Sequence, residues 1–214
     1  MPRALAVLDF DGTLADSFDA FRTCLDEAAL VHGFRRIADN EAERVRQMSS
    51  RQLMAHLGVA LWQVPTLAVD MRRRMLARID TVRPFPGVDA ALRALAAQDV
   101  SLALVTSNTR DAARQVLGDA TLALFDHLHC GTAMFGKRFK LRELLWASRL
   151  PAGAAVSIGD EIRDADAARA VGMAFIGVRW GYTHPDALQP HSAAPLLDTL
   201  AALPAAVAAH TAMT

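Results

Sequence analysis

Three short apolar runs, each ending abruptly in polar side chains, constrain the fold of this chain more than any other feature. They cover residues 5–8, 102–105 and 154–158, and further strands are expected at about 128–130 and 174–178. Continuous apolar runs of this length suit strands buried on both faces, as in a parallel sheet. Helical periodicity fills the gaps, at 88–98, 111–117, 141–149 and 164–171. The alternation predicts an α/β fold in which helices cover both faces of a parallel sheet.

The segment 16–81 breaks this alternation. It contains amphipathic stretches, with Phe21, Leu25 and Ala28 on one helical face, and no convincing strand. We therefore expect an all-helical subdomain (16–81) inserted into a core made of 1–15 and 82–214. Residues 14–16 and 82–86 would be the two linkers, the second stiffened by prolines. The Ala-rich tail from 193 onward is expected to form a terminal helix.

The balance of charge narrows the classes of partner. The chain has 23 basic and 23 acidic residues, so it lacks the net positive charge with which recognition of nucleic acid or anionic lipid usually begins. Cys24 and Cys130 lie outside any CxxC pattern, and no apolar run reaches the roughly 18 residues of a membrane span. We expect a cytoplasmic protein that binds a small molecule, with neither nucleic acid nor membrane as a partner.

Two carboxylates follow the first apolar run, in Asp9-Phe10-Asp11-Gly12-Thr13. Strand alternation sends Asp9 and Asp11 toward the same side, where their repulsion favours binding of a divalent cation. One carboxylate can attack phosphorus as a nucleophile while the other serves as general acid and then general base. Gly12 permits a tight turn whose amides are free to bind phosphate. Taken alone, an ordinary capped turn explains Asp-Gly better.

Polar residues also follow the next two runs. These are Thr106-Ser107-Asn108 and, further along, Asp160 and Asp164. Because ligands bind beyond the carboxyl ends of the strands in open α/β sheets, we expect these residues to meet Asp9. A hydroxyl there can hold a phosphoryl oxygen, and two acids four residues apart can provide a metal ligand and its support. Each residue taken singly also has an ordinary structural explanation.

With these motifs in order from Asp9 to Trp180, the sequence resembles the haloacid dehalogenase-like hydrolase superfamily, and within it the phosphoglycolate-phosphatase-like branch. The resemblance implies a Rossmann-like core with an inserted helical cap. It implies that Asp9 is the nucleophile and Asp11 the acid/base, and that Thr106 binds phosphate. It further implies Mg²⁺ held by Asp9, the Asp11 carbonyl and Asp160, with Asp164 in support. The other candidate substrate-binding residues are Gly12, Thr13, Ser107, Asn108 and Arg51.

The lysine expected in the third motif is ambiguous. Many relatives carry it as Lys-Pro-x-Pro, whereas this chain reads Gly136-Lys137-Arg138-Phe139-Lys140. Lys137 follows a glycine, in what we expect to be a loop that can reach the strand ends. Lys140 adjoins the predicted helix. We favour Lys137 as the catalytic lysine, and Lys140 stays an alternative.

The implied reaction is hydrolysis of a small phosphorylated metabolite through an aspartyl-phosphate, by a monomer or homodimer. Asp11 favours phosphoryl transfer over dehalogenation, because an ester oxygen usually needs a proton as it leaves. A phosphosugar mutase of the same superfamily is one alternative, and a non-enzymatic phospho-acceptor module is another. Receiver modules of the latter kind are about half this length and carry the acceptor on a later strand. Trp180-Gly181-Tyr182 forms either a packed turn or an edge of the site.

Specificity is expected to come from the helical insertion, since the core residues would contact only the phosphoryl group and metal. Arg51 can bind a carboxylate, such as that of phosphoglycolate, through a bidentate pair. The alternative is that Arg51 caps or solvates its own helix.

Overall fold

A five-stranded parallel sheet forms the centre of the molecule in the computed structural model, which describes residues 3–131 and 136–212. The strands lie in the order β5-β4-β1-β6-β7, so β1 is central and has neighbours from later in the chain on both sides. Their bounds are β1 Ala4–Leu8, β4 Val100–Val105, β5 His127–His129, β6 Ala155–Gly159 and β7 Ala174–Gly177. The predicted parallel α/β fold is confirmed.

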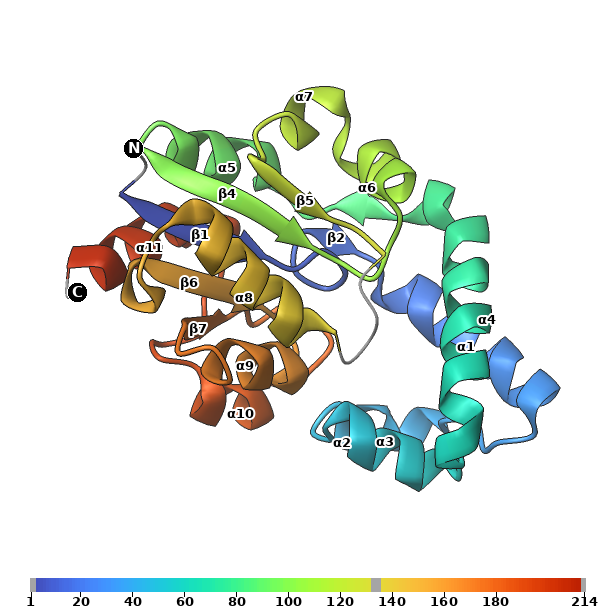
Figure 1. Cartoon of the computed structure of the whole chain (residues 1–214). Coiled ribbons are helices and arrows are strands. Elements are labelled where there is room, and N and C mark those ends of the chain that lie inside the picture. The colour runs from blue at the N-terminus through green and yellow to red at the C-terminus, as the bar shows by residue number, and fades with distance from the viewer. Residues whose placement is uncertain (1–2, 132–135, 213–214) are drawn as a thin grey trace.

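Helices cover both faces of this sheet (Figure 1). Alternate residues of β1 divide between them: Ala6 and Leu8 pack in one apolar cluster, and Leu5 and Val7 pack in the other. The first cluster is completed by α5 (Val88–Ala96), α6 (Arg110–Leu117), α7 (Asp119–Leu122) and α11 (Leu203–Ala212). The second is completed by α8 (Lys137–Ser148), α9 (Ile162–Arg169) and α10 (Pro185–Leu188). Short 3₁₀ turns span Asp39–Glu41, Leu61–Gln63, Ile79–Thr81, Ala152–Ala154, Gln189–His191 and Leu200–Ala202.

The predicted helical insertion stands beside the sheet with an apolar cluster of its own. It contains α1 (Phe18–His32), α2 (Ala42–Val45), α3 (Ser50–Leu57) and α4 (Val64–Ala77). Leu25 of α1, Leu57 of α3 and Leu67 of α4 are buried together in this separate cluster. Figure 1 shows α1 crossing α4, with which it is in contact, and α2 and α3 near the end of α4 remote from its junction with the core. We call these four helices the cap.

The two linkers between core and cap pair with each other. β2 (Ala15–Asp16) and β3 (Arg83–Pro84) form an antiparallel two-residue ladder, and the amide of Phe85 donates to the carbonyl of Leu14 at 2.9 Å. Two residues are too few to show an alternating pattern, so these strands were not predicted. The ladder places the entry to the cap directly beside its exit.

Two helices begin elsewhere than predicted. α8 begins at Lys137, so this lysine is the first helical residue and does not lie in a loop. The C-terminal helix begins only at Leu203, followed directly by Pro204, a residue that suits the first turn of a helix. Residues 1–2, 132–135 and 213–214 of the predicted core lie outside the described residues. Over the described part of the chain, no helix combines the length and the apolarity needed to cross a bilayer.

Candidate active site

The polar residues that follow β1, β4 and β6 meet at one edge of the sheet. β1 lies between β4 and β6, so Asp9 is flanked by Thr106 on one side and Asp160 on the other. Asp164, in the first turn of α9, returns to the same place. All four side chains are buried. The expectation that these motifs converge therefore holds for Asp9, Thr106, Asp160 and Asp164.

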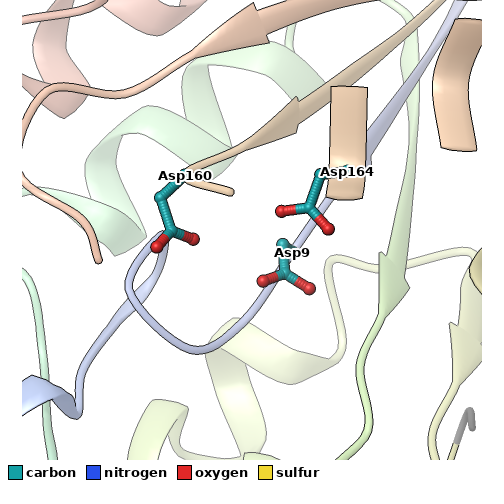
Figure 2. A group of neighbouring side chains, drawn as sticks. All are labelled: Asp9, Asp160 and Asp164. Atoms are coloured by element: carbon teal, nitrogen blue, oxygen red, sulfur yellow. The ribbon is translucent and has the colours of Figure 1, made fainter. Parts of the chain in front are cut away.

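Asp9, Asp160 and Asp164 bring carboxylate oxygens within 4.8 Å of one another (Figure 2). Burial raises the pKa of Asp9 to about 7, although Lys137 acts in the opposite direction. Burial, together with the charges of Glu161, Asp9 and Asp164, also raises the pKa of Asp160. The three carboxylates thus repel one another in a site that water screens poorly.

Lys137 supplies positive charge to two of these carboxylates. Its Nζ donates hydrogen bonds of 2.7 Å to Oδ1 of Asp9 and 2.7 Å to Oδ1 of Asp164. Burial alone would lower the pKa of Lys137, but the two carboxylates outweigh it and the pKa is raised. Lys140 instead pairs with Glu143 at 2.9 Å on the outer side of α8. The structure therefore brings Lys137, and not Lys140, to the strand ends.

The residues at this edge fit a divalent cation. Asp160 accepts hydrogen bonds from Thr13 Oγ1 at 2.8 Å and from the amide of Tyr182 at 2.7 Å. It makes no ion pair with any basic side chain in the described part of the chain. Lys137 is hydrogen-bonded to two of the three buried carboxylates, whereas the nearby Arg163 pairs with Glu161. The cluster therefore keeps excess negative charge on hard oxygen ligands, the donor set that Mg²⁺ prefers.

Two glycines allow the chain to close around Asp160. Gly12 has φ +73°, and a Cβ added there would lie 2.2 Å from Oδ2 of Asp160. A Cβ added at Gly181 would lie 2.0 Å from the Cβ of Asp160. Gly12 therefore does more than form the predicted turn, because it also makes room for a candidate metal ligand. Gly181 therefore lies against Asp160, so the segment Trp180-Gly181-Tyr182 is an edge of this site.

Asp11 is held apart from the three-carboxylate cluster. Its Oδ2 accepts a 2.7 Å hydrogen bond from the side-chain Nδ2 of Asn108. The backbone amide of Asn108 donates to Oγ1 of Thr106 at 2.9 Å. Burial raises the pKa of Asp11 to about 6, against the opposing effect of a hydrogen bond from Ser17. Asp11 lies at the wall of a cavity that it shares with Ser107 and Asn108. A carboxyl group so placed faces any molecule that enters the cavity.

The cavity runs from these core residues into the cap and has a volume of about 240 Å³. Ser50 of α3 is among its lining residues and also bonds Oε2 of Glu161 in the core at 3.2 Å. Arg51, the next residue, is exposed and is not among the lining residues. The structure therefore does not bring Arg51 together with the other predicted site residues.

Tyr182 and Arg46 join the cap to the core and were not among the predicted site residues. The ring of Tyr182 packs on Phe18 and Phe21, with centroids 5.3 and 5.1 Å away, and its hydroxyl lies 2.8 Å from Oγ of Ser17. Arg46 donates to the carbonyl of Tyr182 at 3.1 Å. The sequence signal for Tyr182 was its place after the last strand, whereas Arg46 carried none.

Comparisons with known proteins agree on one family. A model of the haloacid dehalogenase-like hydrolases matches residues 6–178. The chain is 31% identical over 183 residues to a phosphoglycolate phosphatase of Synechococcus elongatus, covering 85% of this chain and 86% of the relative. It is 30% identical over 208 residues to the probable phosphatase IndB of Dickeya dadantii, covering 92% and 90%.

Solved structures show the same fold. A predicted phosphatase from Clostridium acetobutylicum superposes with a TM-score of 0.78 at 18% identity, covering 96% of this chain and 98% of that one. A putative phosphoglycolate phosphatase from Lactobacillus plantarum gives a TM-score of 0.75 at 22% identity, covering 94% and 97%. These proteins therefore share the fold over nearly the whole length of the chain.

Proposed function

Because the chain belongs to the haloacid dehalogenase-like hydrolase family, we propose that it hydrolyses a small phosphomonoester through an aspartyl-phosphate formed on Asp9. The protein is a phosphatase of the phosphoglycolate-phosphatase-like kind, in line with its curated relatives. The observation that carries the covalent mechanism is the contact of Lys137 with Asp9 at the strand ends. The Lys137 ammonium lowers the pKa of Asp9 against the effect of burial, and so favours the charged carboxylate that attacks phosphorus.

In the proposed reaction, a carboxylate oxygen of Asp9 forms a bond to phosphorus while the ester P–O bond breaks. Asp11 gives its proton to the departing alkoxide. Asp11 then takes a proton from water as the water oxygen attacks phosphorus, and the Asp9–phosphorus bond breaks to release phosphate. Asn108 orients Asp11 for both steps through its 2.7 Å hydrogen bond.

Asp9, the Asp11 carbonyl and Asp160 would hold Mg²⁺, with Asp164 in support. When bound, Mg²⁺ would offset negative charge on the transferring phosphoryl group. Lys137 and the Thr106 hydroxyl would bind phosphoryl oxygens. The Ser107-Asn108 turn is the remaining candidate contact, whereas Thr13 uses its hydroxyl to orient Asp160. The expectation that the Gly12 amide is free for phosphate is wrong, because this amide donates to the carbonyl of Ala15 at 2.9 Å. The proposed boundaries are those of the sequence prediction, with the cap at 16–81 and the core at 1–15 and 82–214.

Phosphate release from a panel of small phosphorylated metabolites, with and without Mg²⁺, tests this proposal. Asp9→Asn should remove turnover, because an amide is a poor nucleophile. Retention of more than about a tenth of the wild-type rate would contradict the covalent mechanism, since even acid/base groups contribute 10²- to 10⁴-fold. Isomerisation of a phosphosugar without phosphate release would indicate a mutase. A long-lived phospho-protein without turnover would indicate a phospho-acceptor module.

Asp11 has a separate test. Asp11→Asn should slow the hydrolysis of alkyl phosphates by about 10²-fold or more. It should slow the hydrolysis of p-nitrophenyl phosphate much less, since the departing nitrophenolate needs little protonation. The slow hydrolysis step should also let labelled phosphate accumulate on the protein after an acid quench. Equal losses across leaving groups would exclude Asp11 as the general acid.

A further inference from the structure

The part of the cavity inside the cap is lined mainly by apolar side chains, and we call it the cap chamber. Three helices contribute residues at helical spacing: Phe21 and Leu25 from α1, Leu53 and Leu57 from α3, and Leu67 and Met71 from α4. The two residues of each pair are four positions apart and so share one helix face, and the three faces converge on a common space. The chamber is continuous with the wall that carries Asp11.

Such a chamber suits more than a two-carbon acid. A carboxylate placed among the leucine and methionine side chains, away from Arg22, Arg46 and Arg72 in the lining, would lose hydration without gaining partners, which is costly. An aliphatic or aromatic group would instead remove both its own surface and that of the chamber from water. Met48, Met54, Met71 and Met75 add flexible side chains that can adapt to its shape. The lining thus selects for an apolar leaving group.

One cation in this wall, Arg72, makes no ion pair with any residue that the structure describes. Arg72 of α4 lines the cavity, and its Nε is buried with no hydrogen-bond partner among the residues that the structure describes. Its neighbours Arg73 and Arg74 both bond Asp70, at 2.6 and 2.9 Å. Arg72 itself is only half-buried, so the rest of its guanidinium can donate to an acidic oxygen of a molecule bound in the cavity.

We propose that the substrate is a phosphomonoester whose alcohol part is a mainly apolar body bearing one acidic oxygen group. Its phosphate lies at Asp9 and Asp11, its apolar body fills the cap chamber, and its acidic oxygen accepts from Arg72. This inference rests on the proposed phosphatase function for the position of the phosphate. It deepens that function by naming the class of leaving group.

A chain-length series tests the chamber. With straight-chain alkyl phosphates from ethyl to octyl, kcat/KM should rise about three- to fourfold per methylene until the chamber is full, the gain expected for burying one CH₂. Phosphoglycolate serves as the internal reference. Met71→Gln should flatten the series by placing an amide in the chamber, whereas Leu76→Gln should not, because Leu76 is exposed on the same helix and outside the lining.

Binding of alkylphosphonates separates this inference from the phosphatase proposal, because their C–P bond is not an ester. Thermal unfolding temperature should rise with chain length in the presence of these ligands. If phosphoglycolate is hydrolysed but neither kcat/KM nor the unfolding temperature depends on chain length, the cap chamber does not bind the leaving group. The phosphatase proposal would then still stand. If longer alkylphosphonates stabilise the protein more but no phosphomonoester is hydrolysed, the chamber binds apolar groups as inferred. The proposed phosphatase mechanism would then be wrong.

Carboxyalkylphosphonates with two to six methylenes test Arg72. For the best ligand of that series, Arg72→Met should weaken binding by about 10- to 100-fold, the range expected for a hydrogen bond to a charged group. Binding of the matching alkylphosphonate should change little, because methionine keeps the wall apolar. Arg73→Met is the control, since the Arg73 side chain is 77% exposed. Equal effects of the two variants, or none from Arg72→Met, would remove Arg72 from the site.

Discussion

The ammonium of Lys137 donates a 2.7 Å hydrogen bond to Oδ1 of Asp9, across 128 positions of the chain. Asp9 follows the central strand β1, and Lys137 is the first residue of α8. The same Nζ contacts Asp164, so one buried ammonium orients two carboxylates of different elements. Without this ammonium, burial and repulsion from Asp164 would both destabilise the charged form of Asp9.

Lys137→Ala should therefore lower turnover by at least about 100-fold, in the range for loss of a group that stabilises transition-state charge. Lys140→Ala should stay within about twofold of wild type, because Lys140 pairs with Glu143 at the surface, away from Asp9. Steady-state rates on p-nitrophenyl phosphate measure both. The reverse ranking would assign the third motif to Lys140.

Removal of metal ligands gives a second prediction. Asp160→Asn should weaken Mg²⁺ binding by about tenfold or more, because it removes a hard oxygen ligand that Thr13 and Tyr182 hold in place. Asp164→Asn should weaken it less, since Asp164 already shares its charge with Lys137. The rise in thermal unfolding temperature on Mg²⁺ titration reports affinity without relying on turnover. A larger defect in Asp164→Asn would reverse the two roles.

The sequence predicted the sheet and its polar edge because those features are local. A buried strand followed by Asp9 or Asp160 can be recognised within ten residues, and parallel strands bring their ends together. The choice between Lys137 and Lys140 was not local. It depended on where α8 begins, and Gly136 and Lys137 carry no strong signal for a helix start.

The cap chamber was harder to predict, for a different reason. An apolar stripe on α1, α3 or α4 shows that a helix face is covered, but not whether a neighbouring helix or a ligand covers it. The guanidinium of Arg46 donates to the backbone carbonyls of Gly181 and Tyr182, which lie 135 and 136 residues further along the chain. Backbone acceptors have no sequence pattern, so such contacts appear only in the folded molecule.

Arg51 provides a third prediction. The chamber face of α3 carries Ser50, Leu53 and Leu57, and Arg51 is exposed beside it. We therefore expect Arg51→Ala to leave KM for phosphoglycolate within about twofold, the size of effect expected for an exposed charge. The sequence-based role of Arg51 in carboxylate binding predicts a selective rise instead. A tenfold increase in KM for phosphoglycolate, with p-nitrophenyl phosphate unchanged, would establish that role.

The last prediction concerns stability of the cap. Asp70 is 8% exposed and accepts from Arg74 at 2.9 Å and Arg73 at 2.6 Å, and its Oδ2 lies 3.0 Å from Nε2 of His32. The hydrogen bond from Arg74 is the main reason that the pKa of Asp70 lies well below its usual range, with His32 and Arg73 adding to it. Because the folded state holds the charged carboxylate, Asp70 stabilises the fold above the ordinary aspartate pKa of 3.8.

This contribution is lost as the pH falls below 3.8 toward the lowered pKa of the folded state, since the unfolded chain then binds the proton more readily. Asp70→Asn should cost about 1–3 kcal/mol of unfolding free energy at pH 7, the range for hydrogen bonds to a charged group. The difference in unfolding free energy between Asp70→Asn and wild type should shrink as the pH falls from 5 to 2, roughly the range over which a salt-bridged aspartate loses its stabilising effect. Urea unfolding at several pH values measures it, with Asp80→Asn as an exposed control in the same part of the chain. A deficit in Asp70→Asn that stays constant across that range would mean that packing, rather than the ionised carboxylate, joins α1 to α4 at this point.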